Sequence, residues 1–485
     1  MDVQNIIDKV PTCLYINGQW RDAQGGNTFD VENPATGQVI ARVADGTQDD
    51  ALEAIKVAGD TQKEWAATAP RERSEILRRA YELLMERQDD IAAVMCSEMG
   101  KSLTESKGEV AYGAEFFRWF AEEAVRVGGD FTMSTDGKTR LMVSREPVGP
   151  CVLVTPWNFP LAMGTRKIGP AIAAGCTMVF KPAKLTPLTS LMLVQALEDA
   201  GLPAGVLNVV TSKSASRVVT PWMESGIARK VSFTGSTGVG IGLLEQAAQN
   251  VMKSSMELGG NAPFVVCEDA DLDAAVEGAM LAKMRNIGEA CTAANRFYVH
   301  ESLAQDFASK MVERMEALKV GNGIEEGVDI GPLVEESARD KVDSLVSDAV
   351  AKGAKVATGG KKIDGPGYFY QPTVLTDVPR DADIAVEEIF GPVAPIFTFN
   401  NDDEAIEQAN STDFGLAGYI FTQSLDRGLR LSEELQVGMV GLNTGLVSNP
   451  AAPFGGVKQS GLGREGSNVG IDEYLEVKYV ATPRS

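Results

Sequence analysis

One cysteine of this chain lies in a setting that suits a nucleophile. Cys291 follows a glycine-containing break at residues 285–290, which separates a helical pattern from a strand-like run at residues 297–300. The chain has a single histidine, His300, so the usual Cys-His and Ser-His hydrolase pairs would all depend on that residue. A carboxylate or a lysine is therefore expected to act as the base. The best carboxylate is Glu257, because two glycines follow closely and let the backbone approach a ligand or another segment.

The length and the charge of the chain limit the classes of protein to consider. A chain of 485 residues exceeds what one hydrophobic core normally organises, so two or more domains are expected. The net charge of −22 argues against nucleic-acid and anionic-membrane partners, because these need clustered lysines and arginines. An acidic substrate would therefore need its own local cationic pocket.

The cysteines and the N-terminus indicate where the protein works. The 6 cysteines are far apart and show no metal-type spacing, which disfavours a disulfide framework or a zinc site. Reduced thiols in a cytosolic compartment are the simpler interpretation. The N-terminus has no secretory pattern, and no stretch has the length and apolarity of a membrane span. We therefore expect a soluble, cytoplasmic protein without a bound metal.

Short apolar runs alternate with longer helical patterns along the chain. Strands are expected at residues 152–155, 177–180 and 206–210, and helices at residues 51–65 and 190–200. This alternation predicts α/β layers with a mostly parallel sheet.

A glycine turn at residues 235–240 lies between a strand-like run and a helical pattern at residues 241–251. Such a turn suits a cofactor phosphate, although a tight connection without a ligand would have the same pattern. A second series of strands and helices, from residue 263 to about residue 447, is long enough for a second α/β domain.

Motifs spread over nearly the whole chain resemble those of the aldehyde dehydrogenases. They include residues 15–20 (Tyr-Ile-Asn-Gly-Gln-Trp), 33–37 (Asn-Pro-Ala-Thr-Gly) and 453–461 (Pro-Phe-Gly-Gly-Val-Lys-Gln-Ser-Gly). Within that family, residues 461–467 and 470–479 look most like the succinate-semialdehyde branch.

The resemblance implies the aldehyde dehydrogenase fold, an α/β fold with three parts. These parts would be a Rossmann-like cofactor domain at residues 1–122 and 147–253, an α/β catalytic domain at 254–469, and a small β oligomerisation flap at 123–146 and 470–485. It also implies a homodimer or a homotetramer.

The resemblance gives catalytic roles to Cys291, Glu257 and Asn158. A Cys291 thiolate that adds to an aldehyde forms a thiohemiacetal, which can expel hydride to a nicotinamide. The Asn158 side-chain amide and the Cys291 backbone N–H would stabilise the oxyanion, and Glu257 would activate the water that hydrolyses the thioester. Taken singly, the three residues could equally be a buried thiol, a turn residue and a solvated carboxylate.

Two neighbours of Cys291 differ from residues seen in family members. Where the family usually has glutamine, two residues before the cysteine, this chain has Glu289. A carboxylate that faced the sulfur would raise the pKa of the thiol and slow its attack, so we expect Glu289 to point away. Ala293 stands where some members of the branch have a second cysteine, so a redox disulfide at that position is not expected.

The choice of cofactor depends on two lysines. Lys181 matches the family lysine that bonds the adenosine ribose, and Lys184 stands where NAD-using members carry a glutamate. Two lysines should attract a 2′-phosphate, so we expect NADP, with NAD as the alternative if Lys184 is simply a solvated lysine. The other cofactor residues that the resemblance implies are Thr155, Pro156, Trp157, Gly235, Ser236, Glu388 and Phe390.

Substrate recognition is expected to depend on Arg166, Arg285 and Ser448, which match carboxylate-binding positions of the succinate-semialdehyde branch. Each arginine is six to eight residues from a catalytic residue, close to two helical turns, so both could face one pocket. Arginine binds a carboxylate in bidentate fashion. An arginine at the surface or at a helix terminus is the alternative.

These assignments together predict oxidation of succinate semialdehyde to succinate with NADP. The nearest alternative is another aldehyde with a distal carboxylate, such as glutarate semialdehyde, because arginines recognise a carboxylate and not a chain length. A CoA-acylating dehydrogenase is disfavoured, since those members generally lack the glutamate that matches Glu257. A non-enzymatic protein on the same fold is disfavoured because Cys291, Glu257 and Asn158 are all present.

Overall fold

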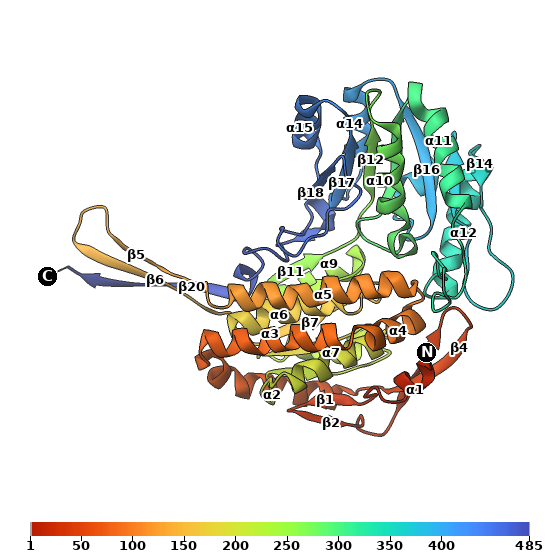
Figure 1. Cartoon of the computed structure of the whole chain (residues 1–485). Helices are drawn as coiled ribbons and strands as arrows, with labels where there is room; N and C mark the ends of the chain where they lie inside the picture. The colour runs from red at the N-terminus through yellow and green to blue at the C-terminus, as the bar shows by residue number, and fades with distance from the viewer. Residues whose placement is uncertain (1, 485) are drawn as a thin grey trace.

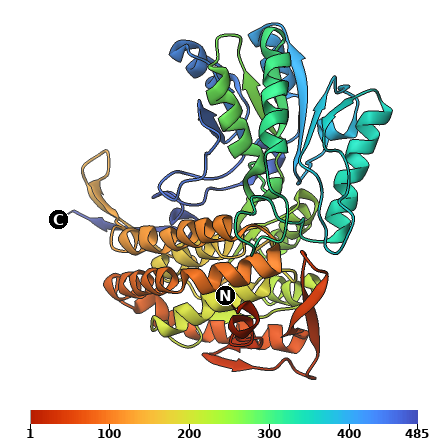
Figure 2. The same cartoon turned by 45° about the vertical axis from the view of Figure 1, so that its right-hand side comes forward.

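The chain folds into two α/β lobes and a projecting β arm (Figure 1). The computed structural model describes residues 2–484. Met1, the first residue of the predicted cofactor domain, and Ser485, the last residue of the predicted flap, lie outside the described residues. The lower lobe holds the N-terminal half of the chain, and the upper lobe is built mainly from the C-terminal half (Figures 1 and 2).

The lower lobe is organised by a sheet whose five central strands are parallel. In spatial order the sheet reads β19 (Gly461–Leu462), β11 (Lys253–Glu257), β10 (Lys230–Thr234), β7 (Cys151–Val154), β8 (Met178–Lys181), β9 (Leu207–Val209), β1 (Leu14–Ile16) and β2 (Gln19–Arg21). The chain starts this parallel set at the centre, in β7, runs outward to β9 and then returns to β10 and β11. The order therefore reverses between β7 and β10, and ligands of such sheets bind beyond the carboxyl ends of the strands at that point.

Both faces of this sheet are covered, which explains why its strands read as continuous apolar runs. Leu153 and Phe180 pack into a core on one face, whereas Val152 and Val179 pack into a second core on the other. Successive side chains of a strand point to opposite faces, so a strand between two layers needs apolar residues at every position. All four residues of β7 and of β8 are buried.

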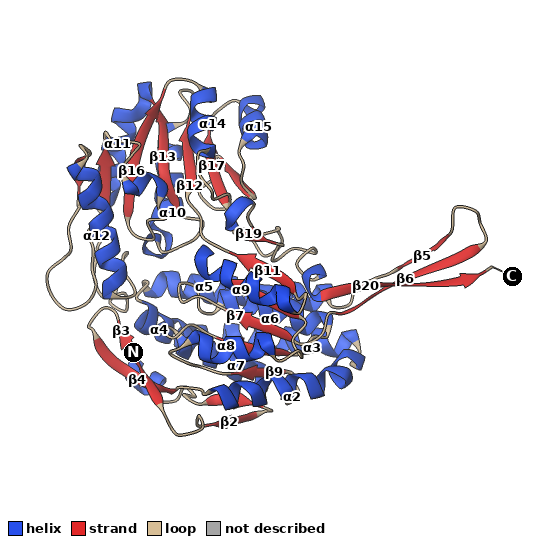
Figure 3. Ribbon diagram, turned by 180° about the vertical axis from the view of Figure 1, so that it is seen from behind, coloured by secondary structure: helices blue, strands red, loops and turns tan. Residues whose placement is uncertain are grey.

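Helices of the lower lobe surround this sheet (Figure 3). They are α1 (Val3–Ile7), α2 (Gln48–Ala67), α3 (Pro70–Glu86), α4 (Gln88–Met99), α5 (Leu103–Glu123), α6 (Ala162–Ala174), α7 (Pro187–Asp199), α8 (Ala215–Glu224) and α9 (Thr237–Gln249), and a separate hairpin comprises β3 (Thr28–Asn33) and β4 (Gln38–Ala44). The start of α2 shows how local sequence sets a boundary, because Thr47 and Asp50 exchange side-chain and backbone hydrogen bonds in a capping box.

The upper lobe contains a second sheet with six parallel strands and one antiparallel edge strand. Its spatial order is β14 (Lys355–Thr358), β15 (Thr373–Thr376), β16 (Val393–Phe399), β13 (Ala294–His300), β12 (Ala262–Val266), β17 (Ala417–Phe421) and β18 (Met439–Leu442). The helices of this lobe are α10 (Leu272–Met284), α11 (Glu301–Glu316), α12 (Glu336–Ala351), α13 (Asp383–Val386), α14 (Asp402–Asn410) and α15 (Leu425–Glu434). One core cluster, with Phe264, Phe297 and Tyr419 among its members, joins sheet and helices.

The projecting arm is a three-stranded antiparallel sheet made from two distant segments. It consists of β5 (Asp130–Met133), β6 (Thr139–Pro147) and β20 (Leu475–Pro483), with β6 in the centre. The arm leaves the lower lobe and ends near the C-terminus (Figures 1 and 3). Large apolar side chains are exposed on it, including Phe131, Val477 and Tyr479 at 66%, 69% and 65%.

The expected α/β class and the expected local elements are confirmed. The strands predicted at residues 152–155, 177–180 and 206–210 correspond to β7, β8 and β9. The helix predicted at residues 241–251 overlaps α9, but α9 begins at Thr237, inside the predicted glycine turn, and ends at Gln249. The predicted boundary between the cofactor and catalytic domains, after residue 253, cuts through the lower sheet, because β11 starts at Lys253 and pairs with β19 within that sheet. A boundary that followed the sheets would fall after Glu257 rather than after residue 253.

Candidate active site

Cys291 lies in a loop between α10 and β13. The loop begins with Asn286, Ile287 and Gly288 in left-handed backbone conformation, at φ values of 57°, 63° and 78°. An added Cβ at Gly288 would lie 2.3 Å from the carbonyl oxygen of Gly391, so glycine is required there for space as well as for conformation. The loop thus turns back sharply after α10 and brings Cys291 toward the lower lobe.

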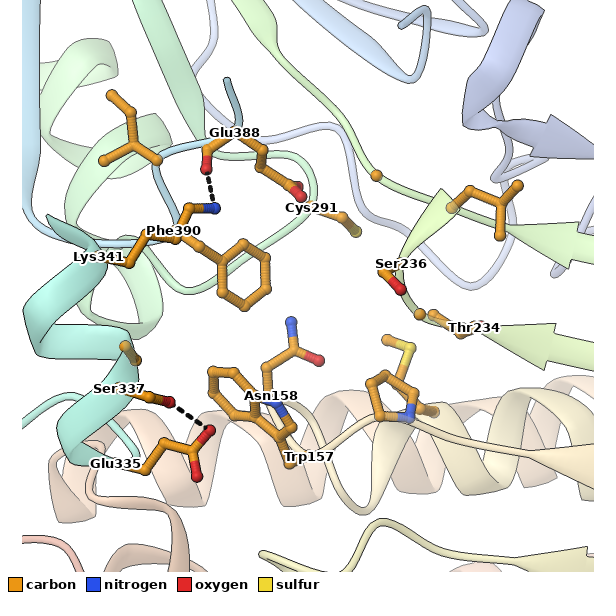
Figure 4. A pocket seen from close by; sticks show the side chains of 17 residues that line it. Trp157, Asn158, Thr234, Ser236, Cys291, Glu335, Ser337, Lys341, Glu388 and Phe390 are labelled. Atoms are coloured by element: carbon orange, nitrogen blue, oxygen red, sulfur yellow. Dashed lines mark hydrogen bonds between the residues drawn. The ribbon is translucent and has the colours of Figure 1, made fainter. Parts of the chain in front are cut away.

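The cavity that contains Cys291 has a volume of about 330 Å³ and is lined by both lobes. Figure 4 shows the Cys291 sulfur, the Asn158 amide and the Phe390 ring around one open space. The structure therefore brings together residues that are far apart in the sequence. The predicted site residues that line this cavity are Pro156, Trp157, Asn158, Gly235, Ser236, Cys291, Glu388 and Phe390.

The surroundings of Cys291 keep its thiol protonated. Burial raises the pKa of Cys291 to about 12, and the carboxylates of Glu388 and Glu257 add to the effect while the Arg166 guanidinium opposes it. The reactive form is the thiolate, so the free protein holds its nucleophile in a latent state. A positive charge or a base at the cavity is needed for attack.

Asn158 follows β7, at the switch point of the lower sheet. Its side-chain Nδ2 donates to the backbone carbonyl oxygen of Glu289 at 2.9 Å, and the backbone carbonyl of Asn158 accepts from Lys101 Nζ at 2.7 Å. The second N–H of the amide remains available to an oxyanion in the cavity. The backbone carbonyl of Asn158 and one N–H of its side-chain amide are thus held, and the residue is only 5% exposed, so the amide costs little reorganisation when it stabilises charge.

Glu257 ends β11 and is buried, with neither carboxylate oxygen hydrogen-bonded to a described residue. Burial and the nearby carboxylate of Glu465 raise the pKa of Glu257 well above its ordinary value, and Arg166 and Lys167 offset part of this shift. The ionised form of a carboxyl group with a raised pKa is a stronger base than an ordinary carboxylate, and its free oxygens can accept a proton from water. Glu257 does not line the Cys291 cavity, although its charge acts on that thiol.

The Glu289 carboxylate is held by another segment of the chain. Its Oε1 accepts from the Val334 N–H at 3.2 Å, and the carboxylates that raise the pKa of Cys291 are Glu388 and Glu257. Burial raises the pKa of Glu289 well above its ordinary value. The residue that departs from the family pattern therefore anchors the loop before Cys291 to the segment before α12.

The residues expected to hold a dinucleotide lie along the carboxyl edge of the lower sheet. Gly235 and Ser236 follow β10 and precede α9, whose N-terminal N–H groups point to this edge, as a pyrophosphate requires. Thr155, which follows β7, is buried and its hydroxyl has no hydrogen-bond partner among the described residues. This donor set suits a phosphate-bearing ligand.

Glu388 and Phe390 come from the upper lobe and face that edge. Glu388 Oε1 accepts from the Gly260 N–H at 3.1 Å, and burial raises the pKa of this carboxyl to about 7. Phe390 has a φ of 54° and its ring meets Trp157 edge to face, with 5.5 Å between centroids (Figure 4). A strained bulky residue at a cavity wall indicates that neighbouring contacts hold it there.

Lys181 and Lys184 lie at the carboxyl end of β8, outside the Cys291 cavity. Lys181 is 5% exposed, and its Nζ donates to the carbonyl of Pro182 at 2.9 Å. Burial, followed by the charge of Lys184, lowers the pKa of Lys181 to about 8. Lys184 is exposed. Two ammonium groups that repel each other at a strand end would gain from an anion between them.

The expected carboxylate-binding residues are divided between two environments. Arg285 and Ser448 line a second cavity of about 620 Å³. That cavity is also lined by Asn286, whose side chain donates to the backbone carbonyl of Asn158. Because Asn158 lines the Cys291 cavity, the two cavities are neighbours. The Arg285 guanidinium lies 5.7 and 5.0 Å from the ring centroids of Tyr112 and Phe159.

Arg166 lies in neither cavity, which differs from the expectation that both arginines face one pocket. Its Nε is 2.9 Å from Glu465 Oε2, and its guanidinium packs 3.8 Å from the Phe454 ring centroid. The helical spacing that motivated the expectation does not apply, because α6 starts only at residue 162 and a left-handed turn follows Arg285. Arg166 Nη2 has no hydrogen-bond partner among the described residues.

Several lining residues carried no recognisable signal in the sequence. Glu335, Ser337 and Lys341, at the start of α12, line the Cys291 cavity, and Lys341 Nζ donates to the carbonyl of Glu388 at 2.7 Å (Figure 4). An amphipathic pattern predicts such a helix but not that its first turn faces the other lobe. Lys101, Glu109 and Asn286 line the second cavity, and no pattern in the sequence indicates this.

Within residues 2–484, no group of three or more His, Cys, Asp or Glu side chains is placed to hold a metal ion. No described helix has both the length and the apolar character that crossing a membrane requires.

A doubly wound sheet of this kind is typical of a dinucleotide-binding protein, and the cavity with the Cys291 thiol lies at its switch point. Comparison with known proteins identifies the family: the chain belongs to the aldehyde dehydrogenase family, whose model matches residues 20–480. The expectation drawn from the motifs is confirmed.

Individual relatives are similar over almost their whole length. A succinate-semialdehyde dehydrogenase of Paenarthrobacter nicotinovorans is 58% identical over 91% of this chain and 98% of its own. A glutarate-semialdehyde dehydrogenase of Pseudomonas putida is 52% identical over 96% of each. Among solved structures, an E. coli NADP-dependent enzyme superposes with a TM-score of 0.97 at 48% identity, over 99% of both chains.

Proposed function

We propose that this chain oxidises succinate semialdehyde to succinate and passes the hydride to NADP. The observation that carries the proposal is the pair of neighbouring cavities, one with Cys291 and Asn158 and the other with the cationic Arg285. A relative at 58% identity that is named for this reaction supports it.

The chemistry assigned to the chain uses three side chains. The Cys291 thiolate adds to the aldehyde carbon, and the Asn158 amide with the Cys291 N–H stabilises the oxyanion. Collapse of the resulting thiohemiacetal expels hydride and leaves a thioester on Cys291. Glu257 then takes a proton from water, which attacks the thioester and releases the carboxylate.

The residues at the sheet edge suit a dinucleotide that supplies the hydride acceptor. Gly235 and Ser236 would hold the pyrophosphate, and Glu388 would accept from the nicotinamide ribose. Lys181 and Lys184 at the end of β8 favour a 2′-phosphate, and the similar E. coli enzyme is NADP-dependent. Thr155, Pro156, Trp157 and Phe390 would enclose the rest of the cofactor.

Recognition of the distal carboxylate is assigned mainly to Arg285 and Ser448. Among the described residues no ion pair within 4.0 Å neutralises Arg285, and aromatic rings flank its guanidinium, so it can take a carboxylate. Arg166 is already paired with Glu465, so its role is secondary. Its Nη2, which has no hydrogen-bond partner among the described residues, can still donate to the carboxylate, and its charge lowers the pKa of Cys291.

Glutarate semialdehyde is the second candidate substrate. The Pseudomonas putida relative named for it is 52% identical, and a cavity of about 620 Å³ has room for a longer chain. The chemistry at Cys291 would be the same.

We further propose the three-part division in which residues 123–146 and 470–485 form an oligomerisation flap. The projecting arm exposes Phe131, Val477 and Tyr479, and its outer strand β20 has a free edge, which favours pairing in a homodimer or homotetramer. The 6 free cysteines fit a reducing compartment, and we place the protein in the cytoplasm. Sedimentation of the full chain measures the assembly.

One panel of assays tests the proposed function. NADPH and NADH formation is followed for succinate semialdehyde, glutarate semialdehyde and butyraldehyde, with and without CoA. We expect the highest kcat/KM for succinate semialdehyde with NADP and a free acid as product. A higher value for glutarate semialdehyde would transfer the assignment to the second candidate. Formation of an acyl-CoA would show that Glu257 does not direct the thioester to water.

A further inference from the structure

The turn that precedes Cys291 is held in an unfavourable backbone conformation. Asn286 and Ile287 both have positive φ, and for a β-branched residue such as Ile287 this is a rare conformation. Asparagine tolerates it better, because its short side chain can bond locally. Contacts around the turn must therefore hold it, and Ile287, which is buried in the upper core, supplies only apolar ones.

Asn286 makes the polar contacts of this turn. Its backbone N–H donates to Glu105 Oε1 at 2.6 Å, which ties the turn to α5. Its side-chain Nδ2 donates to two carbonyl oxygens, that of Asn158 at 3.2 Å and that of Glu289 at 2.8 Å. Asn286 is 1% exposed, so water cannot replace these bonds.

The two carbonyls belong to the two segments that the proposed chemistry must align. Glu289 is two residues before Cys291, and Asn158 carries the amide assigned to the oxyanion. Asn158 Nδ2 donates to the same Glu289 carbonyl at 2.9 Å, so the two asparagine amides share one acceptor.

The Asn158 turn is also held from its far side. Lys101 Nζ donates to the Asn158 carbonyl and pairs with Glu109 at 2.5 Å, with both side chains 1% exposed. Glu109 Oε1 accepts from the N–H groups of Leu161 and Ala162, at the start of α6. One side of the turn is thus fixed to the lower lobe, and Asn286 makes the link to the nucleophile loop.

We propose that Asn286 is a positioning residue that clamps the Cys291 loop to the Asn158 turn and so sets the spacing of the two oxyanion donors. The inference rests on the proposed function, because it assigns Asn286 an effect through Asn158. A merely structural asparagine would change stability and leave the alignment of Cys291 and Asn158 intact.

Two substitutions remove the clamp while tolerating the backbone. Asn286→Gly keeps positive φ and deletes the amide, and Asn286→Asp keeps the shape but turns the donors into acceptors that face two carbonyls. We expect kcat with succinate semialdehyde and NADP to fall by about 10- to 100-fold, because a small misplacement of reacting groups has an effect of this size. The Kd for NADP should change by less than about threefold, since the residues assigned to it lie elsewhere.

A double substitution separates positioning from stability. Asn158→Ala alone should lower kcat by about 100- to 1000-fold, and adding Asn286→Gly should cost at most about a further threefold, because the clamp has nothing left to position. The matched control is Asn208→Ala, which removes another buried amide, in β9, whose Nδ2 donates to the carbonyl of Gly205. It should lower the melting temperature and leave kcat unchanged.

Different results overturn different claims. Two outcomes would refute the role of Asn286 and leave the proposed function intact. One is full kcat in both Asn286 variants, and the other is a kcat loss in the double variant equal to the product of the two single losses. Full kcat in Asn158→Ala, or a wild type that oxidises none of the aldehydes, would refute the proposed function. In that case a crystal structure of Asn286→Asp still tests whether Asn286 holds the two segments together. We expect the Asn158 and Glu289 carbonyls to move apart in this variant, and an unchanged geometry would refute the clamp.

Discussion

Replacing Arg285 by methionine tests how the protein recognises its substrate. The guanidinium lies in the second cavity over two aromatic rings, and among the described residues no ion pair within 4.0 Å neutralises it. Methionine keeps the unbranched apolar stem and removes only the charge and the five N–H donors. The change therefore isolates the interaction with an anionic group of the substrate.

The size of the effect follows from the environment of Arg285. A hydrogen bond to a charged group contributes about 1.5–3 kcal/mol. A guanidinium can make two such hydrogen bonds to the same carboxylate. Arg285 is partly exposed, so solvent screens part of this energy. We expect a loss of about 2–3 kcal/mol in kcat/KM for succinate semialdehyde, which corresponds to about 30- to 160-fold.

The assay compares two aldehydes and two arginines. Steady-state NADPH formation is measured with succinate semialdehyde and with butyraldehyde, which lacks the carboxylate and should show almost no change. Arg314→Met is the matched control, because Arg314 lines the same cavity but pairs with Glu277 at 2.7 Å. Equal losses on both aldehydes would mean that Arg285 supports the Cys291 loop and does not bind the carboxylate. A larger loss in Arg314→Met would place the carboxylate at the other end of the cavity.

Four further predictions concern the nucleophile, the base and the cofactor. Cys291→Ala should abolish turnover and retain NADP binding, whereas Cys267→Ala should keep turnover; residual activity in pure Cys291→Ala would contradict the assignment. Because burial raises the pKa of Cys291 to about 12, its alkylation by iodoacetamide without cofactor should accelerate about tenfold per pH unit between about pH 7 and 10, and a plateau in that range would disprove the latent thiol. Glu257→Gln should still form the thioester and release at most one NADPH per site in stopped flow, and normal steady-state turnover would exclude it as the base. Lys184→Glu should lower the ratio of kcat/KM for NADP to that for NAD by about tenfold, since a carboxylate repels the 2′-phosphate; an unchanged ratio would show a lysine without a cofactor contact.

Local sequence was sufficient for the elements and for the family. The strands β7, β8 and β9 could be predicted because a strand buried on both faces needs an unbroken apolar run, and such runs are visible without any tertiary information. The motifs at residues 15–20, 33–37 and 453–461 indicated the family, and the comparison with the family model confirms it.

The sequence also contained the components of the cavity but not their arrangement. Asn158 and Cys291 are 133 positions apart, and their meeting depends on how the two sheets face each other. The same holds for α12: its pattern predicts a helix, yet only the packing within the upper lobe brings Lys341 to the carbonyl of Glu388.

The two arginines show most clearly where sequence reasoning ends. Their spacing from the catalytic residues suggested one shared pocket, but spacing translates into direction only inside a regular helix. A left-handed turn follows Arg285 and an irregular segment precedes α6, so the side chains separate. Burial then decides their state: Arg166 is enclosed and paired with Glu465, whereas Arg285 stays in an open cavity. Residue types and motifs were thus determined by the sequence alone, and the pairing, burial and pKa of each charged group were determined by the tertiary structure, because they depend on neighbours that are distant along the chain.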